Sequence, residues 1–191
     1  EAARAYERPR ECFAVDTWEG DSHAGAYDNQ VFESVDTFNR ENFAEFSTLI
    51  RSTFDQALNQ FEDGSIDLLH IDGFHSYEAV SHDYSSWLPK LSERAVVLFH
   101  DTNEHRDGFG VWKFWAEVRQ NRPSFEFLHS HGLGVLAVGP QAPAPVLALC
   151  AFTGQPEEPL IQNRYAHIGG RWEAQSHSLY VTGLLNDTKA E

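Results

Sequence analysis

Two short apolar runs, each ending in an acid, constrain the fold of this chain more than any other feature. The runs are "IDLLHID" (66–72) and "AVVLFHD" (95–101). Between them, apolar side chains recur every three or four residues, as on one face of a helix, at Tyr77, Val80, Tyr84, Trp87 and Leu91. Continuous apolar strands that alternate with helices predict an α/β fold with parallel strands.

The N-terminal part continues this alternation. The segment "CFAVD" (12–16) predicts a strand that ends in an acid. Residues 17–40 are polar and glycine-containing, and we expect a long loop with a short helix there. A short strand near 48–51 and a helix to about residue 61 should follow.

The C-terminal part predicts one more helix and a hairpin. The segment "GVWKFWAEVRQ" places one apolar stripe on a helix, formed by Val111, Phe114, Trp115 and Val118. The segment "FEFLHSHGLGVLAVG" predicts two antiparallel strands around a glycine turn. The chain as a whole predicts a doubly wound, mostly parallel sheet with an antiparallel C-terminal hairpin. We expect this α/β domain to span 1–140 and a helical tail to span 141–191.

Composition excludes some classes of partner. The net charge is -15 and the isoelectric point is near 4.9, which argues against nucleic acid and anionic membranes. No apolar run is long enough to span a membrane. Two cysteines, Cys12 and Cys150, do not make a disulfide framework, so we expect a reducing, cytoplasmic environment.

Acidic and imidazole side chains collect where the predicted strands end. Three strands end in Asp16, Asp72 and Asp101, while His75 follows the second of these acids and His100 precedes the third. In open parallel sheets, ligands bind outside the carboxyl ends of the strands. We therefore expect these groups to share one edge of the sheet.

Each of these residues also has a simpler interpretation. An acid after a strand, such as Asp72 or Asp101, is often only the N-cap of the next helix. His100 could be a core histidine, and His75 could cap the following helix. Two acids and two histidines at adjacent strand ends nevertheless favour a divalent-metal site, with magnesium, manganese, iron and zinc all open.

Other candidates carry a weaker signal. An acid in the position of Asp16 can bind ribose hydroxyls, and Trp18 could pack on an adenine or simply belong to the core. We expect His70 to be structural, because strand alternation points it away from the face of Ile71. The histidines in loops and in the tail are expected to be solvated, namely His105, His129, His131, His167 and His177.

Three segments together resemble a known family. They are "CFAVDTWEGD", "IDLLHIDGFHSYEAVSHDYSSWLPKL" and "AVVLFHDTN", the last followed by "FGVWKFW". They are similar to class I S-adenosylmethionine-dependent methyltransferases, which have a Rossmann-like fold. The likeness is strongest to the branch of small-molecule and sugar O-methyltransferases that are encoded with, or fused to, glycosyltransferases, and it covers about 10–140.

The resemblance implies roles for individual residues. Asp16 matches the acid that holds the cofactor ribose. The resemblance implies that the cofactor is bound by Asp16, Thr17, Trp18 and Asp72. Asp72 and Asp101 match carboxylates that hold a divalent metal, magnesium or manganese, in metal-dependent members. His100 stands where some relatives have a second acid, and we expect it to be a third ligand. His75 lies near the position of a general base, so we expect it to be catalytic.

One part of the family pattern is missing from this sequence. The first strand and its glycine-rich "E-x-G-x-x-x-G" loop, which hold the methionine part of the cofactor, do not occur. The chain also contains no methionine. We therefore interpret the opening "EAARAYERPR" as the end of the first helix of a longer domain, and expect the missing strand at the centre of the sheet. The alternative is a degenerate relative that binds the cofactor poorly.

Three functional hypotheses follow. The leading one is a metal-assisted O-methyltransferase with S-adenosylmethionine as cofactor and a hydroxyl of a sugar or other small molecule as acceptor. The second is a metal-dependent hydroxylase or hydrolase on the same scaffold. The third is a non-catalytic module that partners a glycosyltransferase. A glycosyltransferase partner or fusion and a homo-oligomer are both compatible with the sequence.

Overall fold

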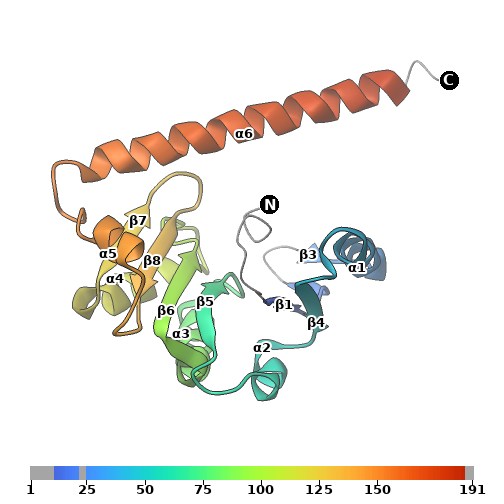
Figure 1. The fold of residues 1–191 in the computed structure, drawn as a ribbon. Coiled ribbons are helices and arrows are strands. Elements are labelled where there is room, and N and C mark those ends of the chain that lie inside the picture. Colours follow the sequence, from blue (N-terminus) through green and yellow to red (C-terminus); the bar gives the residue numbers. More distant parts are fainter. Residues whose placement is uncertain (1–10, 22–24, 188–191) are drawn as a thin grey trace.

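The computed structural model describes residues 11–21 and 25–187 (Figure 1). The interpretation of "EAARAYERPR" as the end of a helix falls outside the described residues. The strands are β1 (Cys12–Asp16), β2 (Gly20–Asp21), β3 (Gly25–Ala26), β4 (Ser47–Arg51), β5 (Ile66–Ile71), β6 (Leu91–His100), β7 (Ser124–Phe127) and β8 (Leu133–Ala137). The α-helices are α1 (Asn29–Phe43), α2 (Phe54–Ala57), α3 (Tyr77–Trp87), α4 (Val111–Val118), α5 (Ala144–Cys150) and α6 (Glu158–Asp187).

The strands form a mixed arrangement. A four-stranded sheet has the order β5-β6-β8-β7, and a separate parallel pair joins β1 to β4 (Figure 1). Strands β5 and β6 are parallel, whereas β8 is antiparallel to both β6 and β7. The predicted hairpin is confirmed. The sheet is less parallel than expected within the described residues, because the hairpin inserts its second strand beside β6.

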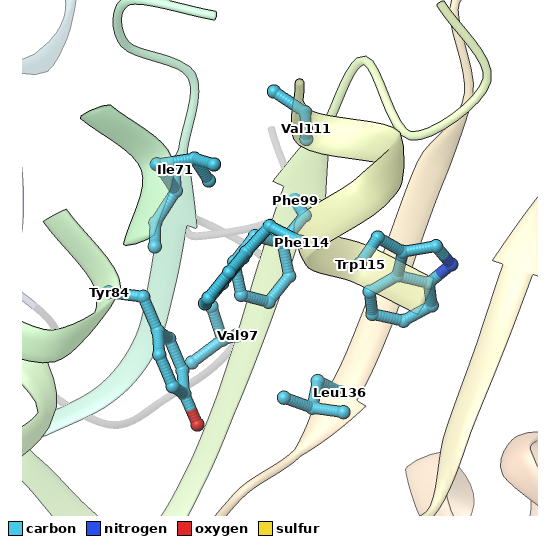
Figure 2. Close-up of a cluster of buried hydrophobic side chains, with 9 residues drawn as sticks. Ile71, Tyr84, Val97, Phe99, Val111, Phe114, Trp115 and Leu136 are labelled. Atoms are coloured by element: carbon cyan, nitrogen blue, oxygen red, sulfur yellow. The ribbon is translucent and has the colours of Figure 1, made fainter. Parts of the chain in front are cut away.

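Helices cover both faces of the four-stranded sheet. Alternate residues of β6 point to opposite sides, so Val97 and Phe99 join one core cluster and Val96 joins another. The first cluster packs α3 and α4 against the sheet (Figure 2) and consists of Ile71, Val80, Tyr84, Val97, Phe99, Val111, Phe114, Trp115 and Leu136. The second packs α5 and the start of α6 against β7 and β8. This is the two-sided arrangement that the alternating pattern predicted.

The two best-predicted helices are confirmed. Helix α3 begins after Ser76, whose hydroxyl accepts a hydrogen bond from the Ala79 amide at 3.1 Å. It passes into a short 3₁₀ turn, Leu88–Lys90, that contains Pro89. Helix α4 buries three of its four predicted apolar residues, and the fourth packs against the same core.

Two other helical segments differ in length or type from the expectation. Residues 17–40 contain the fifteen-residue helix α1, which starts after Asp28, where the Asp28 carboxylate accepts the Gln30 amide at 3.0 Å. This helix is longer than the short one expected, and most of its residues are exposed. The predicted helix before residue 61 is short, since α2 ends at Ala57 and a 3₁₀ turn, Leu58–Gln60, follows.

The part of the predicted tail that the structure describes, up to Asp187, forms two helices. It consists of α5 and the thirty-residue helix α6, which extends beyond the sheet (Figure 1). Tyr165 near the start of α6 packs on Phe127 of β7, with ring centroids 4.8 Å apart. None of the helices in the described ranges is long and apolar enough to cross a lipid bilayer.

Substitution of Phe99 tests whether the core packs as described. Its side chain is fully buried between α3, α4 and the sheet. Replacing it with alanine should leave a cavity and lower the free energy of unfolding by about 3–5 kcal/mol. Phe38 on α1 is 59% exposed, so Phe38→Ala should cost less than about 1 kcal/mol. Urea unfolding of both variants measures the difference, and similar losses would contradict the proposed core.

Asp83 is a buried acid on the inward face of α3. Burial raises its pKa from 3.8 to about 6, although the neighbouring His82 opposes this. Between about pH 4 and pH 6 the folded protein therefore holds a proton that the unfolded chain has lost. Stability should fall as the pH rises through this window, by roughly 2–3 kcal/mol, and the loss should stay constant above it.

Asp83→Asn tests this pH dependence, because an amide cannot ionise. The variant should be more stable than the unmodified protein near pH 7, and this advantage should shrink towards pH 4. Denaturant unfolding at several pH values measures it, with Asp107→Asn on an exposed loop as the control. An advantage of Asp83→Asn that grows as the pH falls would contradict the burial argument.

Candidate functional site

The pairing of β5 with β6 brings the predicted acids together. Ile71 stands opposite Phe99 in this parallel ladder. The next residue of the first strand, Asp72, and the next residues of the second, His100 and Asp101, therefore leave the sheet side by side. A small hollow at this edge is lined by Ile71, Asp72, Gly73, Phe74, His75, Val80, His100, Asp101 and Val111.

Asp101 occupies the centre of the site in an unusual backbone conformation. Its φ angle is +61°, a left-handed conformation that aspartate tolerates better than most residues. The Asp101 amide donates to the Gly132 carbonyl at 3.1 Å, and its own carbonyl accepts the Glu104 amide at 3.2 Å. The residue is only 4% exposed. The hairpin thus helps to fix a buried carboxylate at the end of β6.

The glycine turn of the hairpin is needed for this contact. Gly132 has a φ angle of +90°, and a Cβ atom there would come within 2.5 Å of the Asn103 amide nitrogen. Glycine is the residue that accepts both conditions. The turn therefore lets the hairpin backbone approach the segment that follows Asp101.

Two imidazoles flank the Asp101 carboxylate. His75 Nε2 lies 2.9 Å from Asp101 Oδ2, and His100 Nδ1 lies 3.1 Å from Asp101 Oδ1. His100 Nδ1 is also 3.3 Å from Asp72 Oδ1, but the angles at this nitrogen do not give a hydrogen bond with any described residue. The contacts of His100 are therefore electrostatic, and His75 makes the shortest of these three imidazole–carboxylate contacts.

The loop before α4 holds the His75 ring. The ring stacks on Phe109, with centroids 4.6 Å apart and an interplanar angle of 14°. The Gly110 amide donates to the His75 carbonyl at 2.7 Å. This approach requires a glycine, because a Cβ atom on Gly110 would lie 2.3 Å from the Tyr77 amide nitrogen. Both the ring and the backbone of His75 are thus held in place.

Charged groups support the outer side of the same loop. The Arg106 guanidinium lies over the Phe109 ring, 4.8 Å from its centroid, and 3.2 Å from Glu104 Oε2. His131 Nδ1 lies 2.8 Å from the same carboxylate. The Arg106 amide and side chain, together with His131, lower the pKa of Glu104 to about 2. The sequence did not predict that Phe109 and Glu104 belong to the site. No motif marks them, and they join the site only through the conformation of their loop.

The segment with Asp72 is held from its other side. Gly73 packs against the Phe54 ring of α2 and the Asp83 carboxylate of α3. A Cβ atom on Gly73 would lie 2.5 Å from Phe54 Cε2 and 3.1 Å from Asp83 Oδ2. Asp72 itself is exposed at the rim. Its carboxylate is therefore accessible, while the backbone that carries it is tightly packed.

The donor set of this site suits a divalent metal. Asp72, His75 and Asp101 each offer one ligand atom, and these three atoms lie within 4.8 Å of one another. Carboxylate oxygen and imidazole nitrogen are common ligands of divalent ions. The structure thus joins His75, which we expected to be catalytic, to the two predicted acids. His100, the predicted third ligand, lies beside them.

The predicted cofactor residues of β1 lie on the separate pair of strands. Asp16 is exposed, and its Oδ1 accepts the Trp18 amide at 2.8 Å. The Thr17 carbonyl accepts Arg51 Nε at 3.2 Å. Trp18 packs on Phe32 of α1, with ring centroids 5.1 Å apart. The exposed carboxylate has the chemistry to accept hydrogen bonds from ribose hydroxyls, and Trp18 already has an aromatic partner.

His70 points away from the face of Ile71, as alternation predicted. Ile71 belongs to the buried core, whereas His70 is exposed. The His70 ring lies 6.3 Å from the His100 ring. It is therefore not a core residue, and it lies on the same face of β5 as the exposed Leu68.

Comparison with solved structures shows what the fold is similar to. The O-methyltransferase TomG of Streptomyces achromogenes, involved in tomaymycin synthesis and solved with S-adenosylmethionine, aligns with a TM-score of 0.50 and 13% identity. The alignment covers 72% of this chain and 76% of TomG. A protein of Corynebacterium glutamicum gives a TM-score of 0.50 at 12% identity, over 68% of this chain and 61% of that one. The fold is the Rossmann-like fold of such methyltransferases.

Comparison of sequences gives the family. Among curated proteins, the chain is 50% identical over 139 residues to the uncharacterized protein y4gI of Sinorhizobium fredii. The match covers 73% of this chain but spans only 15% of the length of that relative. A family model described as a methyltransferase domain matches residues 1–102, the part that carries β1 to β6 and the acids at their ends. The chain therefore belongs to this family of methyltransferase domains.

Proposed function

We propose that the full-length protein is an S-adenosylmethionine-dependent O-methyltransferase that acts on a hydroxyl of a sugar or another small molecule with the help of a divalent metal. The observation that supports this most is the convergence of Asp72, His75 and Asp101 within 4.8 Å of one another. The convergence occurs at the carboxyl ends of β5 and β6, where ligands bind in sheets of this type.

Bound S-adenosylmethionine supplies an electrophilic methyl group on a sulfonium, and a divalent ion supplies the charge that lowers the pKa of an acceptor hydroxyl. The cluster would hold the ion with the carboxylates of Asp72 and Asp101. Two imidazoles, His75 and His100, adjoin Asp101, and one of them would take the hydroxyl proton. The cofactor would supply its methyl group to this oxygen, with the sulfur as the leaving group that keeps the electron pair of the broken carbon–sulfur bond.

Most of the rate enhancement would come from positioning. The transfer requires the acceptor oxygen, the methyl carbon and the sulfur in line, and holding reactants in such a geometry removes much of the entropic barrier. The packing of Gly73 and the stack on Phe109 support this role, because they fix the segments that carry the site.

We also propose that the complete domain has a further strand between β1 and β5. Within the described residues, β1 pairs only with β4 and β5 pairs only with β6, so each presents an open edge. Leu68 on β5 is 60% exposed and Phe13 on β1 is 46% exposed, which is unusual for strands of an α/β sheet. A parallel strand between them, with the family's glycine loop at its end, would cover both edges and complete the cofactor site.

Substitutions in the full-length protein test the function. Asp101→Asn should abolish methyl transfer, because the central carboxylate of the site loses its charge, but should leave the affinity for S-adenosylmethionine nearly unchanged. Asp16→Asn should weaken cofactor binding by about tenfold, the size expected for loss of one charge-assisted hydrogen bond. Calorimetry with S-adenosylmethionine measures binding.

Transfer of a radiolabelled methyl group to monosaccharides, nucleotide sugars and catechols measures turnover. Asp107→Asn, on an exposed loop, is the control for both measurements. If the full-length protein fails to bind S-adenosylmethionine, the proposed activity is wrong. If Asp101→Asn is fully active in excess chelator, the proposed methyltransferase activity stands and the proposed role of the metal is wrong.

A further inference from the structure

We infer that the ion at this site is a transition metal with affinity for nitrogen, such as Mn²⁺, Fe²⁺ or Zn²⁺, and that His75 is one of its ligands together with Asp72 and Asp101. The inference rests on the proposed function only in placing a divalent ion at the cluster. It goes further in naming the ligand set and the class of ion.

The spacing of two of the three donor atoms already fits one coordination sphere. Ligands about 2.1 Å from an ion at right angles to each other are about 3 Å apart. His75 Nε2 and Asp101 Oδ2 are 2.9 Å apart, so they already have this separation. The three ligand atoms lie within 4.8 Å of one another, slightly more than the separation of about 4.2 Å between ligands on opposite sides of an ion. A shift of the exposed Asp72 side chain would complete the set.

The orientation of His75 is fixed before any ion binds. Its ring stacks on Phe109 at 4.6 Å, and its carbonyl accepts the Gly110 amide at 2.7 Å. Arg106 lies over the same Phe109 ring and is itself paired with Glu104. A preorganised imidazole loses little conformational entropy when it coordinates, which favours it as a ligand.

His100 is oriented differently. Its Nδ1 atom is enclosed and makes no hydrogen bond of good geometry with the described residues, although two carboxylate oxygens are 3.1 and 3.3 Å away. An imidazole nitrogen binds an ion along the same direction as it binds a proton. His100 Nδ1 is therefore poorly oriented to bind an ion between these two carboxylates. The side chain is 35% exposed, and because Nδ1 is enclosed, the exposed part lies elsewhere on the side chain.

A histidine ligand determines the class of ion. Mg²⁺ is held by carboxylates, phosphates and water and prefers oxygen donors. Imidazole suits iron, zinc and similar ions, and manganese accepts mixed carboxylate and imidazole sets. Two carboxylates also balance the charge of a divalent ion. The Asp72, His75 and Asp101 set therefore favours a transition ion over Mg²⁺.

Ion titrations of the full-length protein without S-adenosylmethionine test the ligand set. Mn²⁺ should bind at least tenfold more tightly than Mg²⁺. His75→Asp, which makes the set all-oxygen, should reduce this preference at least tenfold, and His75→Gln should lower Mn²⁺ affinity at least tenfold. His100→Ala should change it less than about threefold. His82→Ala is the control, since His82 lies on α3, the helix that follows His75, and pairs with Asp55 at 2.8 Å.

Electron spin echo spectroscopy of bound Mn²⁺ gives a second readout, which also serves if a variant binds weakly. The spectrum should contain a coupling to the nitrogen-14 of an imidazole. The coupling should remain in His100→Ala and in His82→Ala and should disappear in His75→Gln. Circular dichroism establishes that each variant is folded.

The opposite pattern would overturn the inference. A nitrogen coupling that survives in His75→Gln and disappears in His100→Ala would assign the ligand to His100. Absence of nitrogen coupling in the unmodified protein, or tighter binding of Mg²⁺ than of Mn²⁺, would exclude the transition-metal set. These readouts do not involve methyl transfer, so loss of the proposed activity and loss of this ligand set would be seen separately.

Discussion

The parallel pairing of β5 with β6 is the constraint on which the candidate site depends. Because Ile71 stands opposite Phe99, Asp72 and Asp101 leave the sheet next to each other. Both paired residues are buried in the same core cluster, so a shift of one residue would move them to the wrong face. Packing of α3 and α4 against this face therefore fixes the register, and the register brings the acids together.

Elements outside the two strands hold the side chains of the site in place. The hairpin of β7 and β8 reaches Asp101 through a backbone hydrogen bond from the Asp101 amide to the Gly132 carbonyl. The loop before α4 holds His75 by the Phe109 ring. By contrast, β1 and its acid, Asp16, lie on a second sheet whose inner edge is open, as is the facing edge of β5. The described residues therefore hold Asp101 and His75 in place. The cofactor site, as proposed, also includes a further strand.

Sequence reasoning predicted the parts of the structure that local patterns encode. The strands before Asp72 and Asp101 are apolar and end in acids, and α3 and α4 have clear apolar stripes, so their positions followed from periodicity. The length of helix α1 was underestimated, because polar residues outnumber its apolar residues, which are Val31, Phe32, Val35, Phe38 and Phe43. The sequence also predicted that His75 would share one edge with the acids. Its stacking on Phe109 could not be predicted, since that residue comes from a distant loop whose conformation no short motif specifies.

Anomalous diffraction from crystals of the full-length protein soaked with Mn²⁺ tests the metal centre most directly. The account predicts one strong anomalous peak within about 2.1–2.3 Å of His75 Nε2 and of one carboxylate oxygen each from Asp72 and Asp101. A fully soaked crystal with no peak there, in which His75 Nε2 still pairs with Asp101, would contradict it. The strand ends would then carry a histidine–aspartate pair without a metal.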